Sequence, residues 1–309
     1  AGMDCLAHHG GVYPPNAVPY RVNHEIMRIY SSDPEMDLDQ ALKRIAKQWA
    51  GDQDAALLLK VWKLAEEAVL AFPSTVGLYS TFGFTWYRLW HRPLVPNLQA
   101  VPEEERAFYE DYICTTPHNP NNVDLSKDVL FALTTPERCE EDLTRMDENL
   151  WPPLDQAIQM LAEHLNSQYQ EFEPDNVLYD QWIRLRALRC WLRTQHSVAA
   201  WIAGVHGYMQ ATEATEKQRY RAMIRTMMEQ EIDNSQQLLE LWQTAKVEFM
   251  AIADKGETPL IYGRRFGENL QRRIQLMQRH MDDEPYIEPD YIEKMAARMV
   301  GHPDLNKVY

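Results

Sequence analysis

Two segments of the chain gather side chains that could recognise a small polar ligand. Residues 79–97 are dense in aromatic rings and carry two arginines, whereas residues 115–124 are rich in asparagine and contain a histidine. Flat rings can cover the faces of pyranose sugars, and amide and guanidinium groups bind hydroxyls or a carboxylate. These residue types predict a sugar site, for which we single out Trp86, Tyr87, Arg88, Trp90, Arg92, His118, Asn119 and Asn122.

The same two segments are also compatible with a purely structural role. Trp and Tyr fill protein cores while keeping one polar handle, and Asn-rich stretches form turns. A packed junction is therefore the alternative interpretation of both segments.

Other chemistries lack the residues they need. The sequence contains no G-x-G-x-x-G, no G-x-x-x-x-G-K-[ST] and no G-x-S-x-G, and none of its ten histidines follows a Glu by three positions. His8 and His9 could be drawn as metal ligands, but adjacent side chains diverge. The acidic runs occur where a solvated helix face explains them. We expect neither a metal nor a cofactor.

Composition restricts the partners. The chain has 309 residues, with 31 Lys and Arg against 46 Asp and Glu, a net charge of −15. This balance disfavours nucleic acid and anionic membrane surfaces, which clustered cations bind. No window is apolar enough to span a bilayer. The cysteines stand far apart, so we expect free thiols; the compartment is not predictable.

Apolar residues recur with helical spacing along most of the chain, which predicts an all-α fold. We expect an elongated helical bundle with a long antiparallel helix hairpin and two long structured loops. Asp37 should cap the first of these helices and Gly51 should end it. The other expected helices cover 53–72, 136–167 with an interruption at Pro152-Pro153, 176–212, 215–254, 265–281 and 289–299.

The expected hairpin contains a polar interruption. The apolar stripe of the helix over 215–254 is broken at Glu231 and Asn234. If the turn is centred near residue 213 or 214, antiparallel pairing places residues 193–196 opposite them. A buried polar layer follows, either as a network that fixes the register of the helices or as a ligand site in the bundle.

The opening of the chain resembles a known arrangement in glycoside hydrolases. It runs from Gly10-Gly11 and Pro14-Pro15 through Asn23 and Ile26-Met27-Arg28-Ile29-Tyr30 to Asp33-Pro34, Asp37, Leu42, Ile45-Ala46 and Trp49. This run resembles the exit from a (β/α)8 barrel into the C-terminal helical domain of enzymes such as the α-glucuronidases and the β-N-acetylhexosaminidase-like enzymes. The remainder looks like helical regions of large bacterial carbohydrate-active proteins.

The resemblance implies that catalysis and part of the sugar binding belong to different domains. In such enzymes the catalytic carboxylates lie on the barrel. Residues 1–33 would then be an irregular segment leaving an upstream catalytic domain of the same polypeptide, and residues 34–309 a helical domain that contributes loops to an oligosaccharide or glycoside site. Two alternatives stay open: an autonomous helical enzyme with its active site in loops 79–97 and 115–124, and a helical protein-interaction module.

Overall fold

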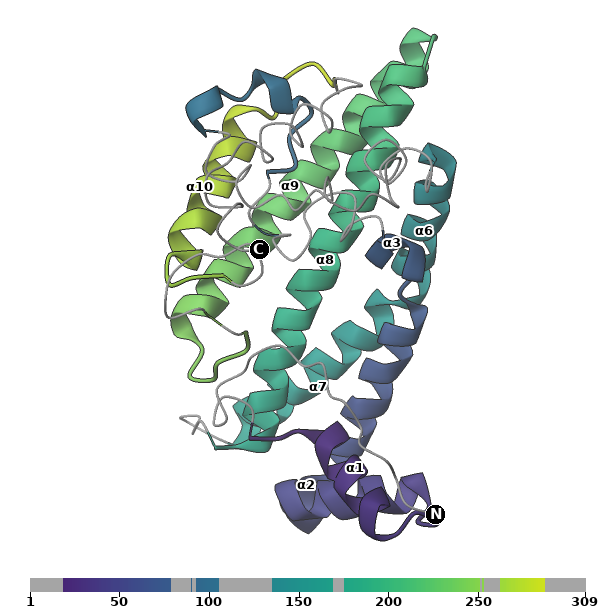
Figure 1. The fold of residues 1–309 in the computed structure, drawn as a ribbon, viewed down its shortest axis with the longest axis vertical. Coiled ribbons are helices and arrows are strands. Elements are labelled where there is room, and N and C mark those ends of the chain that lie inside the picture. The colour runs from purple at the N-terminus through teal and green to yellow at the C-terminus, as the bar shows by residue number, and fades with distance from the viewer. Residues whose placement is uncertain are drawn as a thin grey trace, which may run out of the picture. The chain divides into compact units, whose positions relative to one another are not determined.

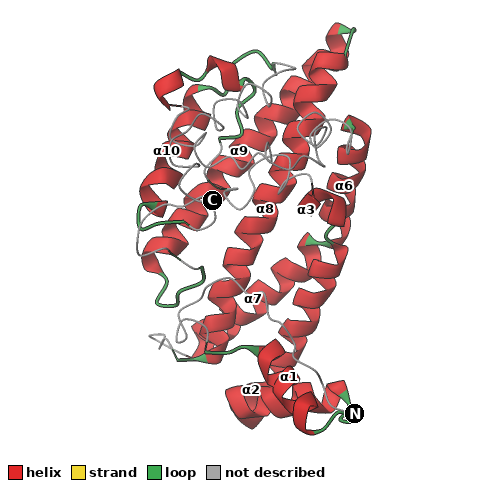
Figure 2. Ribbon diagram, in the orientation of Figure 1, coloured by secondary structure: helices red, strands yellow, loops and turns green. Residues whose placement is uncertain are grey.

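The computed structural model describes residues 19–78, 90, 93–105, 135–168, 175–250, 252 and 262–286. These residues form helices and no strand, apart from isolated bridge positions such as the parallel bridge between Asn97 and Tyr286 (Figures 1 and 2). The predicted all-α class is thereby confirmed. The loop expected over 115–124 and the helix expected over 289–299 lie outside the described residues. None of the helices described combines the length and the hydropathy that crossing a bilayer requires.

The chain divides into two compact units. Unit 1 takes in the described parts of Ala1–Ala71, Glu148–Arg189 and Thr244–Ala251; unit 2 takes in those of Phe72–Asp147, Cys190–Gln243 and Ile252–Tyr309. In this division residues 19–33 and 34–71 fall in the same unit, and the domain boundary expected at residue 33 stays a prediction.

Unit 1 is built on α1 (Val22–Ser32), α2 (Leu38–Ala71), α7 (Trp151–Gln168) and the first part of α8 (Val177–Gln210). The apolar faces of α2 and α7 pack together, and α1 packs on α2. Asp37 Oδ1 accepts the Gln40 N–H at 3.1 Å, which confirms the predicted cap. At Gly51 the backbone leaves helical geometry with φ +72°, so α2 changes direction where the sequence predicted a helix end.

One expectation for the N-terminal segment is wrong. Residues 22–32 form α1 instead of continuing the irregular stretch that we expected up to residue 33. Ile29 is buried against Ala41 and Ile45 of α2, with Val22 and Ile26 packed beside them. The apolar residues of α1 are spaced so that they pack on α2, and this packing stabilises the helix. The expectation of an irregular segment did not take this packing into account.

Unit 2 contains α3 (Ser74–Leu78), η2 (Leu98–Ala100), α6 (Pro136–Asn149), α8 from Cys190 onward, α9 (Ala214–Thr244) and α10 (Phe266–Arg279). Thr194 meets Glu231, while Gly204 lies against Ile224 and Gly207 against Tyr220. Residue numbers rise on α8 as they fall on α9, so these helices run antiparallel. A Cβ on Gly204 would lie 2.5 Å from Ile224 Cγ1, so the glycine permits this close approach.

Helix boundaries follow local chemistry with one exception. α6 ends and α7 begins around Leu150, as Pro152-Pro153 predicted, because proline fits the first turn of a helix and not its interior. α9, however, ends at Thr244, ten residues before its expected end at 254. Its continuation is interrupted where the Lys246 N–H donates to the hydroxyl of Tyr179 on α8, at 3.3 Å. Here a tertiary hydrogen bond replaces a helical one.

Candidate functional site

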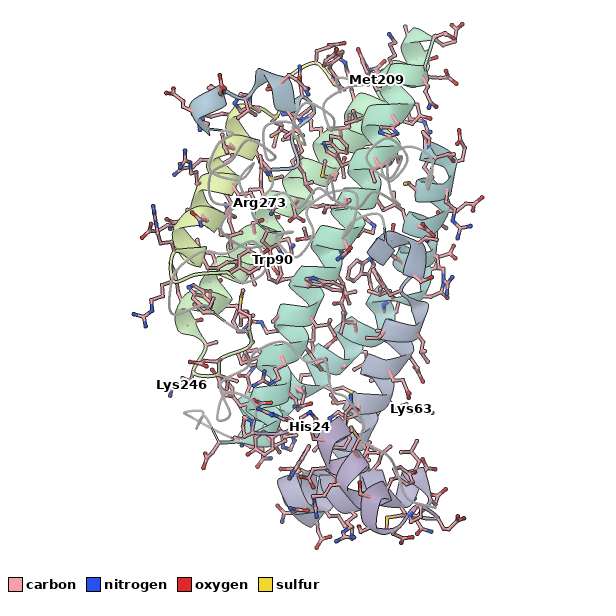
Figure 3. All side chains as sticks on the ribbon, in the orientation of Figure 1. His24, Lys63, Trp90, Met209, Lys246 and Arg273 are labelled. Carbon is pink, nitrogen blue, oxygen red and sulfur yellow. The ribbon has the colours of Figure 1, made fainter. Side chains whose placement is uncertain are left out.

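Of the eight residues predicted to bind sugar, the structure describes one. Trp90 lies in unit 2 with only 7% of its surface exposed (Figure 3). The other seven lie outside the described residues: Trp86, Tyr87, Arg88, Arg92, His118, Asn119 and Asn122.

Trp90 is held at both its backbone and its ring. Its backbone N–H donates to the hydroxyl of Tyr262 at 3.0 Å, and its indole Nε1–H donates to Thr194 Oγ1 at 3.1 Å. Edge-to-face contact with Phe266 of α10, at 5.8 Å between ring centroids, covers the ring. The indole is therefore oriented by its surroundings, and its only donor is already used.

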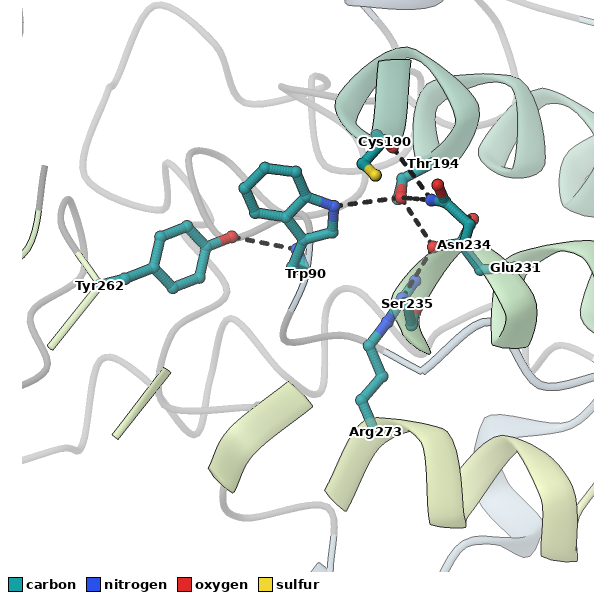
Figure 4. A network of polar contacts seen from close by, with 8 residues as sticks. All are labelled: Trp90, Cys190, Thr194, Glu231, Asn234, Ser235, Tyr262 and Arg273. Atoms are coloured by element: carbon teal, nitrogen blue, oxygen red, sulfur yellow. Dashed lines mark hydrogen bonds and ion pairs between the residues drawn. The ribbon is translucent and has the colours of Figure 1, made fainter. Parts of the chain in front are cut away.

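Thr194 is the centre of a buried polar cluster on α8, α9 and α10 (Figure 4). Besides the bond from Trp90, its hydroxyl contacts Glu231 Oε1 at 2.7 Å and Asn234 Nδ2 at 3.0 Å. A hydroxyl offers one donor and two acceptor lone pairs, so these three contacts use its full capacity. We call Trp90, Thr194, Glu231, Asn234, Ser235 and Arg273 the polar layer.

The polar layer contains a fully buried ion pair. Arg273 Nη1 of α10 lies 2.7 Å from Glu231 Oε1 of α9, and both side chains are 0% exposed. Arg273 Nη1 also lies 2.6 Å from Ser235 Oγ, one turn further along α9. Burial of two charges is tolerated when they pair and make further hydrogen bonds, and here Arg273 Nη1 contacts both Glu231 and Ser235.

Asn234 joins the polar layer through its amide nitrogen and not through its amide oxygen. Its Nδ2 donates to the backbone carbonyl of Cys190 at 3.0 Å as well as to Thr194. Because the Cys190 carbonyl can only accept, the orientation of the amide is fixed. Asn234 Oδ1 is buried and has no hydrogen-bond partner.

The polar layer that the sequence predicted opposite Glu231 and Asn234 is present, with Thr194 inside the expected window 193–196. Two members were missed. Arg273 occupies the apolar stripe of α10, between Leu270 and Met277, and a charge in such a stripe was the signal that could have found it. The participation of Trp90 had no local signal, because its partner lies 104 residues away.

Two residues, one before the aromatic segment and one within it, contact nearby positions of α8. Phe72 contacts Trp191 of α8 at 6.0 Å between ring centroids, and Trp90 contacts Thr194, which is three residues further along the same helix. Positions three apart lie on one helix face about 5–6 Å from each other. Phe72 and Trp90 thus contact the same face of α8, through partners three residues apart.

Residues 93–96 form core and not a ligand-facing surface. Pro93 to Pro96 are all buried, although the sequence places them in the predicted loop 79–97. The indole N–H of Trp201, one further heptad along α8 from Thr194, donates to the Val95 carbonyl at 2.7 Å. Trp90 and Val95 thus contact α8 at successive positions, in the direction of that helix.

Two of the described carboxyl groups have pKa values shifted away from what a proton donor needs. A hydrogen bond from Arg279 lowers the pKa of Glu105, and a hydrogen bond from its own backbone N–H, with one from Thr135, lowers that of Glu137. A general acid at neutral pH needs the opposite shift. Burial lowers the pKa of His206 to about 4, so this imidazole is neutral at pH 7.

The described residues do not bring together the side chains that metal binding or thiol chemistry would need. Those residues contain no group of three or more His, Cys, Asp or Glu side chains that could hold a metal ion. Cys139 and Cys190 are buried free thiols, as predicted, while Cys5 and Cys114 lie outside the described residues.

Comparison with known proteins gives no assignment: no family model, curated protein or solved structure matches the chain. Its function must therefore be inferred from its own residues and contacts.

Proposed function

We propose that the chain is the helical part of a carbohydrate-active enzyme of the glycoside hydrolase type. In this role it contributes loops to an oligosaccharide site and does not supply the catalytic carboxylates. The observation that carries the proposal is the anchoring of the aromatic segment to α8, through Phe72, seven residues before residue 79, and through Trp90 within the segment. Binding loops depend on such rigid support.

The proposal divides the predicted sugar residues by role. Trp90 is buried and its indole N–H is bonded, so it serves as support. The recognition surface is assigned to the remaining seven residues, whose rings and polar groups fit a pyranose and its hydroxyls or carboxylate.

The carboxyl groups support the second half of the proposal. Glycoside hydrolysis by the usual route uses a carboxylic acid with a raised pKa beside a second carboxylate. In the described part of the chain, Glu231 is committed to Arg273, Asp180 to Arg184 and Glu140 to Arg219. Glu105 and Glu137 have lowered pKa values. We therefore propose that the catalytic pair belongs to an upstream domain.

Titration of the purified chain with acidic and neutral oligosaccharides tests the proposal. We expect weak binding, with a Kd of about 1 mM or higher, because part of the pocket belongs to the upstream domain. Trp86→Ala and Arg88→Ala should abolish this binding. Met209→Ala, which truncates an exposed side chain near the end of α8 in unit 2, should leave it unchanged.

Two results would contradict the proposal in different ways. Turnover of aryl glycosides by the isolated chain, abolished by His118→Ala, would establish an autonomous enzyme. Absence of any sugar binding, together with specific capture of a protein partner, would favour the interaction module.

A further inference from the structure

We propose that Thr194 is a positioning residue which orients the Trp90 indole and, through Glu231, makes that orientation depend on Arg273 of α10. The polar layer then links α10 to the base of the aromatic segment. We call the chain of contacts from Trp90 through Thr194 and Glu231 to Arg273 the relay. The relay does not require a ligand, whereas its effect on sugar affinity rests on the proposed function.

The first step is the direction of the hydrogen bonds at Thr194. The indole of Trp90 and the Nδ2 group of Asn234 can only donate, so both bonds require Thr194 Oγ1 as acceptor. Its single proton must therefore point at Glu231 Oε1, 2.7 Å away. Thr194 can hold Trp90 only while Glu231 takes its proton.

The second step concerns the surroundings that keep the Glu231 carboxylate a hydrogen-bond acceptor. Glu231 Oε1 receives Thr194 and the Arg273 guanidinium, and its other oxygen lies 3.4 Å from Asn234 Nδ2. All of these are donors, and the carboxylate has no exposure to water. Arg273 supplies the balancing positive charge without which a buried carboxylate is strongly disfavoured.

The third step is the consequence of losing that charge. With a neutral side chain at position 273, the buried carboxyl of Glu231 would hold a proton and become a donor. Thr194 Oγ1 lies 2.7 Å from Glu231 Oε1, and its lone pairs already receive Trp90 and Asn234. The protonated carboxyl would compete with the indole for this oxygen, so the indole would lose its hydrogen bond.

A second contact between α10 and Trp90 must be separated from this relay. Phe266 touches the indole edge to face at 5.8 Å. That contact is apolar and positions the ring without satisfying its N–H. Removal of the Thr194 hydroxyl alone leaves Phe266 in place and tests the polar route by itself.

The experiment follows exchange of indole N–H protons by NMR in the full chain. Trp90→Phe assigns the Trp90 signal. Trp62 serves as internal control, because its indole donates to Gln181 in unit 1. The test variants are Thr194→Val, which removes the hydroxyl at nearly constant shape, and Thr194→Ser, which retains it. Thr75→Val is the matched control, because it removes the Thr75 bond to Asp142 in the same unit.

We expect Thr194→Val to accelerate exchange of the Trp90 proton at least about fivefold, the factor that a hydrogen bond of about 1 kcal/mol provides. Thr194→Ser should restore slow exchange, while Thr75→Val and the Trp62 signal should show no change. Unaltered Trp90 exchange in Thr194→Val would overturn the proposal.

The dependence on α10 has its own pair of variants. Arg273→Gln should accelerate Trp90 exchange and Arg273→Lys should do so less, because lysine keeps the charge. Acceleration in Thr194→Val with none in folded Arg273→Gln would refute the link to α10. If Arg273→Gln does not fold, Glu231→Gln replaces it, since the neutral amide gives Thr194 a weaker acceptor, and unaltered exchange would again refute the link.

Sugar titration separates the relay from the proposed function. If both hold, Thr194→Val weakens oligosaccharide binding by about the same factor by which it accelerates exchange. If the wild-type chain binds no sugar while the indole responds as expected, the relay stands and the proposed function fails.

Discussion

The two units bury the same kind of polar chain in different ways. In unit 2, the Trp90 indole donates to Thr194, which donates to Glu231, which pairs with Arg273. In unit 1, the Trp62 indole donates to Gln181 Oε1 at 3.0 Å, and Gln181 Nε2 donates to Asp180 Oδ2 at 3.0 Å. Asp180 then pairs with Arg184 at 2.9 Å. Each chain runs from an indole through a neutral side chain to a carboxylate and an arginine.

The ion pairs differ in where their partners lie. Asp180 and Arg184 are four residues apart on α8, and Arg184 is 20% exposed. Glu231 and Arg273 belong to different helices and have no exposure. A local pair with one exposed end can turn to water when its partner is lost, whereas a tertiary buried pair cannot. The same sequence of groups is thus adaptable in unit 1 and rigid in unit 2.

The special glycines repeat this difference. Gly51 in unit 1 is required by its own backbone, with φ +72° and no neighbouring group within 4 Å of the place where a Cβ would stand. Gly204 in unit 2 is helical and is required by its neighbour Ile224. Unit 1 uses local solutions where unit 2 uses tertiary ones.

The largest expected effect comes from Glu231→Ala, which leaves Arg273 buried without its partner. We expect the free energy of unfolding to fall by about 3–5 kcal/mol. Asp180→Ala should lower it by only about 1–3 kcal/mol, because Arg184 can reach solvent. Urea denaturation measures both. Equal losses would show that the position of the partner does not matter.

A double variant sharpens this result. Glu231→Leu combined with Arg273→Met removes both charges together, so it should recover most of the stability lost in Glu231→Ala. Continued severe destabilisation of the double variant would mean that the layer contributes more than paired burial.

The next effect is the pH dependence of stability set by His206. Burial lowers the pKa of His206 to about 4 from its ordinary value of 6.5. Between these values the unfolded chain binds more protons than the folded one, so stability is complete above pH 6.5 and declines as the pH falls towards 4. The total is about 3 kcal/mol.

His206→Leu should flatten this part of the pH profile, as measured by urea denaturation at a series of pH values. His164→Gln in unit 1 is the matched control, because the His164 side chain is 24% exposed beside Asp54. A profile that is unchanged in His206→Leu would refute the assignment of the slope to this imidazole.

The glycines give a smaller pair of effects. Gly204→Ala forces Ile224 to move and should destabilise unit 2 by about 1–3 kcal/mol, reduced by the better helix propensity of alanine. Gly51→Ala should destabilise unit 1 by about 1–2 kcal/mol through backbone strain alone.

Second-site changes distinguish these two causes. Ile224→Val, which shortens the side chain that meets the new Cβ, should partly rescue Gly204→Ala in thermal denaturation. Gly51→Asn should be better tolerated than Gly51→Ala, because asparagine accepts positive φ more readily. If Ile224→Val does not rescue Gly204→Ala, the steric explanation is contradicted.

Features with a local cause could be predicted from the sequence, whereas features with a tertiary cause could not. Local signals gave the cap at Asp37, the break at Gly51 and the interruption before Pro152, since each depends on a residue and its immediate neighbours. The polar layer was predictable in part, because Glu231 and Asn234 interrupt an otherwise apolar stripe. Arg273 and Trp90 were missed because their roles depend on partners on other helices. The end of α9 was missed for the same reason, since a hydroxyl of α8 holds the Lys246 N–H.

The smallest expected effect tests whether local and tertiary pairs still differ once both are exposed. Arg28 pairs with Glu25 on α1 of unit 1, at 2.7 Å, and Arg219 of α9 pairs with Glu140 of α6 in unit 2, at 2.6 Å. The two arginines are 62% and 53% exposed. Arg28→Ala and Arg219→Ala should each lower the free energy of unfolding by less than about 1 kcal/mol, because water and salt screen such charges. Both losses should shrink further at about 1 M NaCl in urea denaturation. A loss above about 2 kcal/mol for Arg219→Ala alone would show that tertiary placement, rather than burial, makes a pair rigid, and would shift the explanation for Glu231 and Arg273 accordingly.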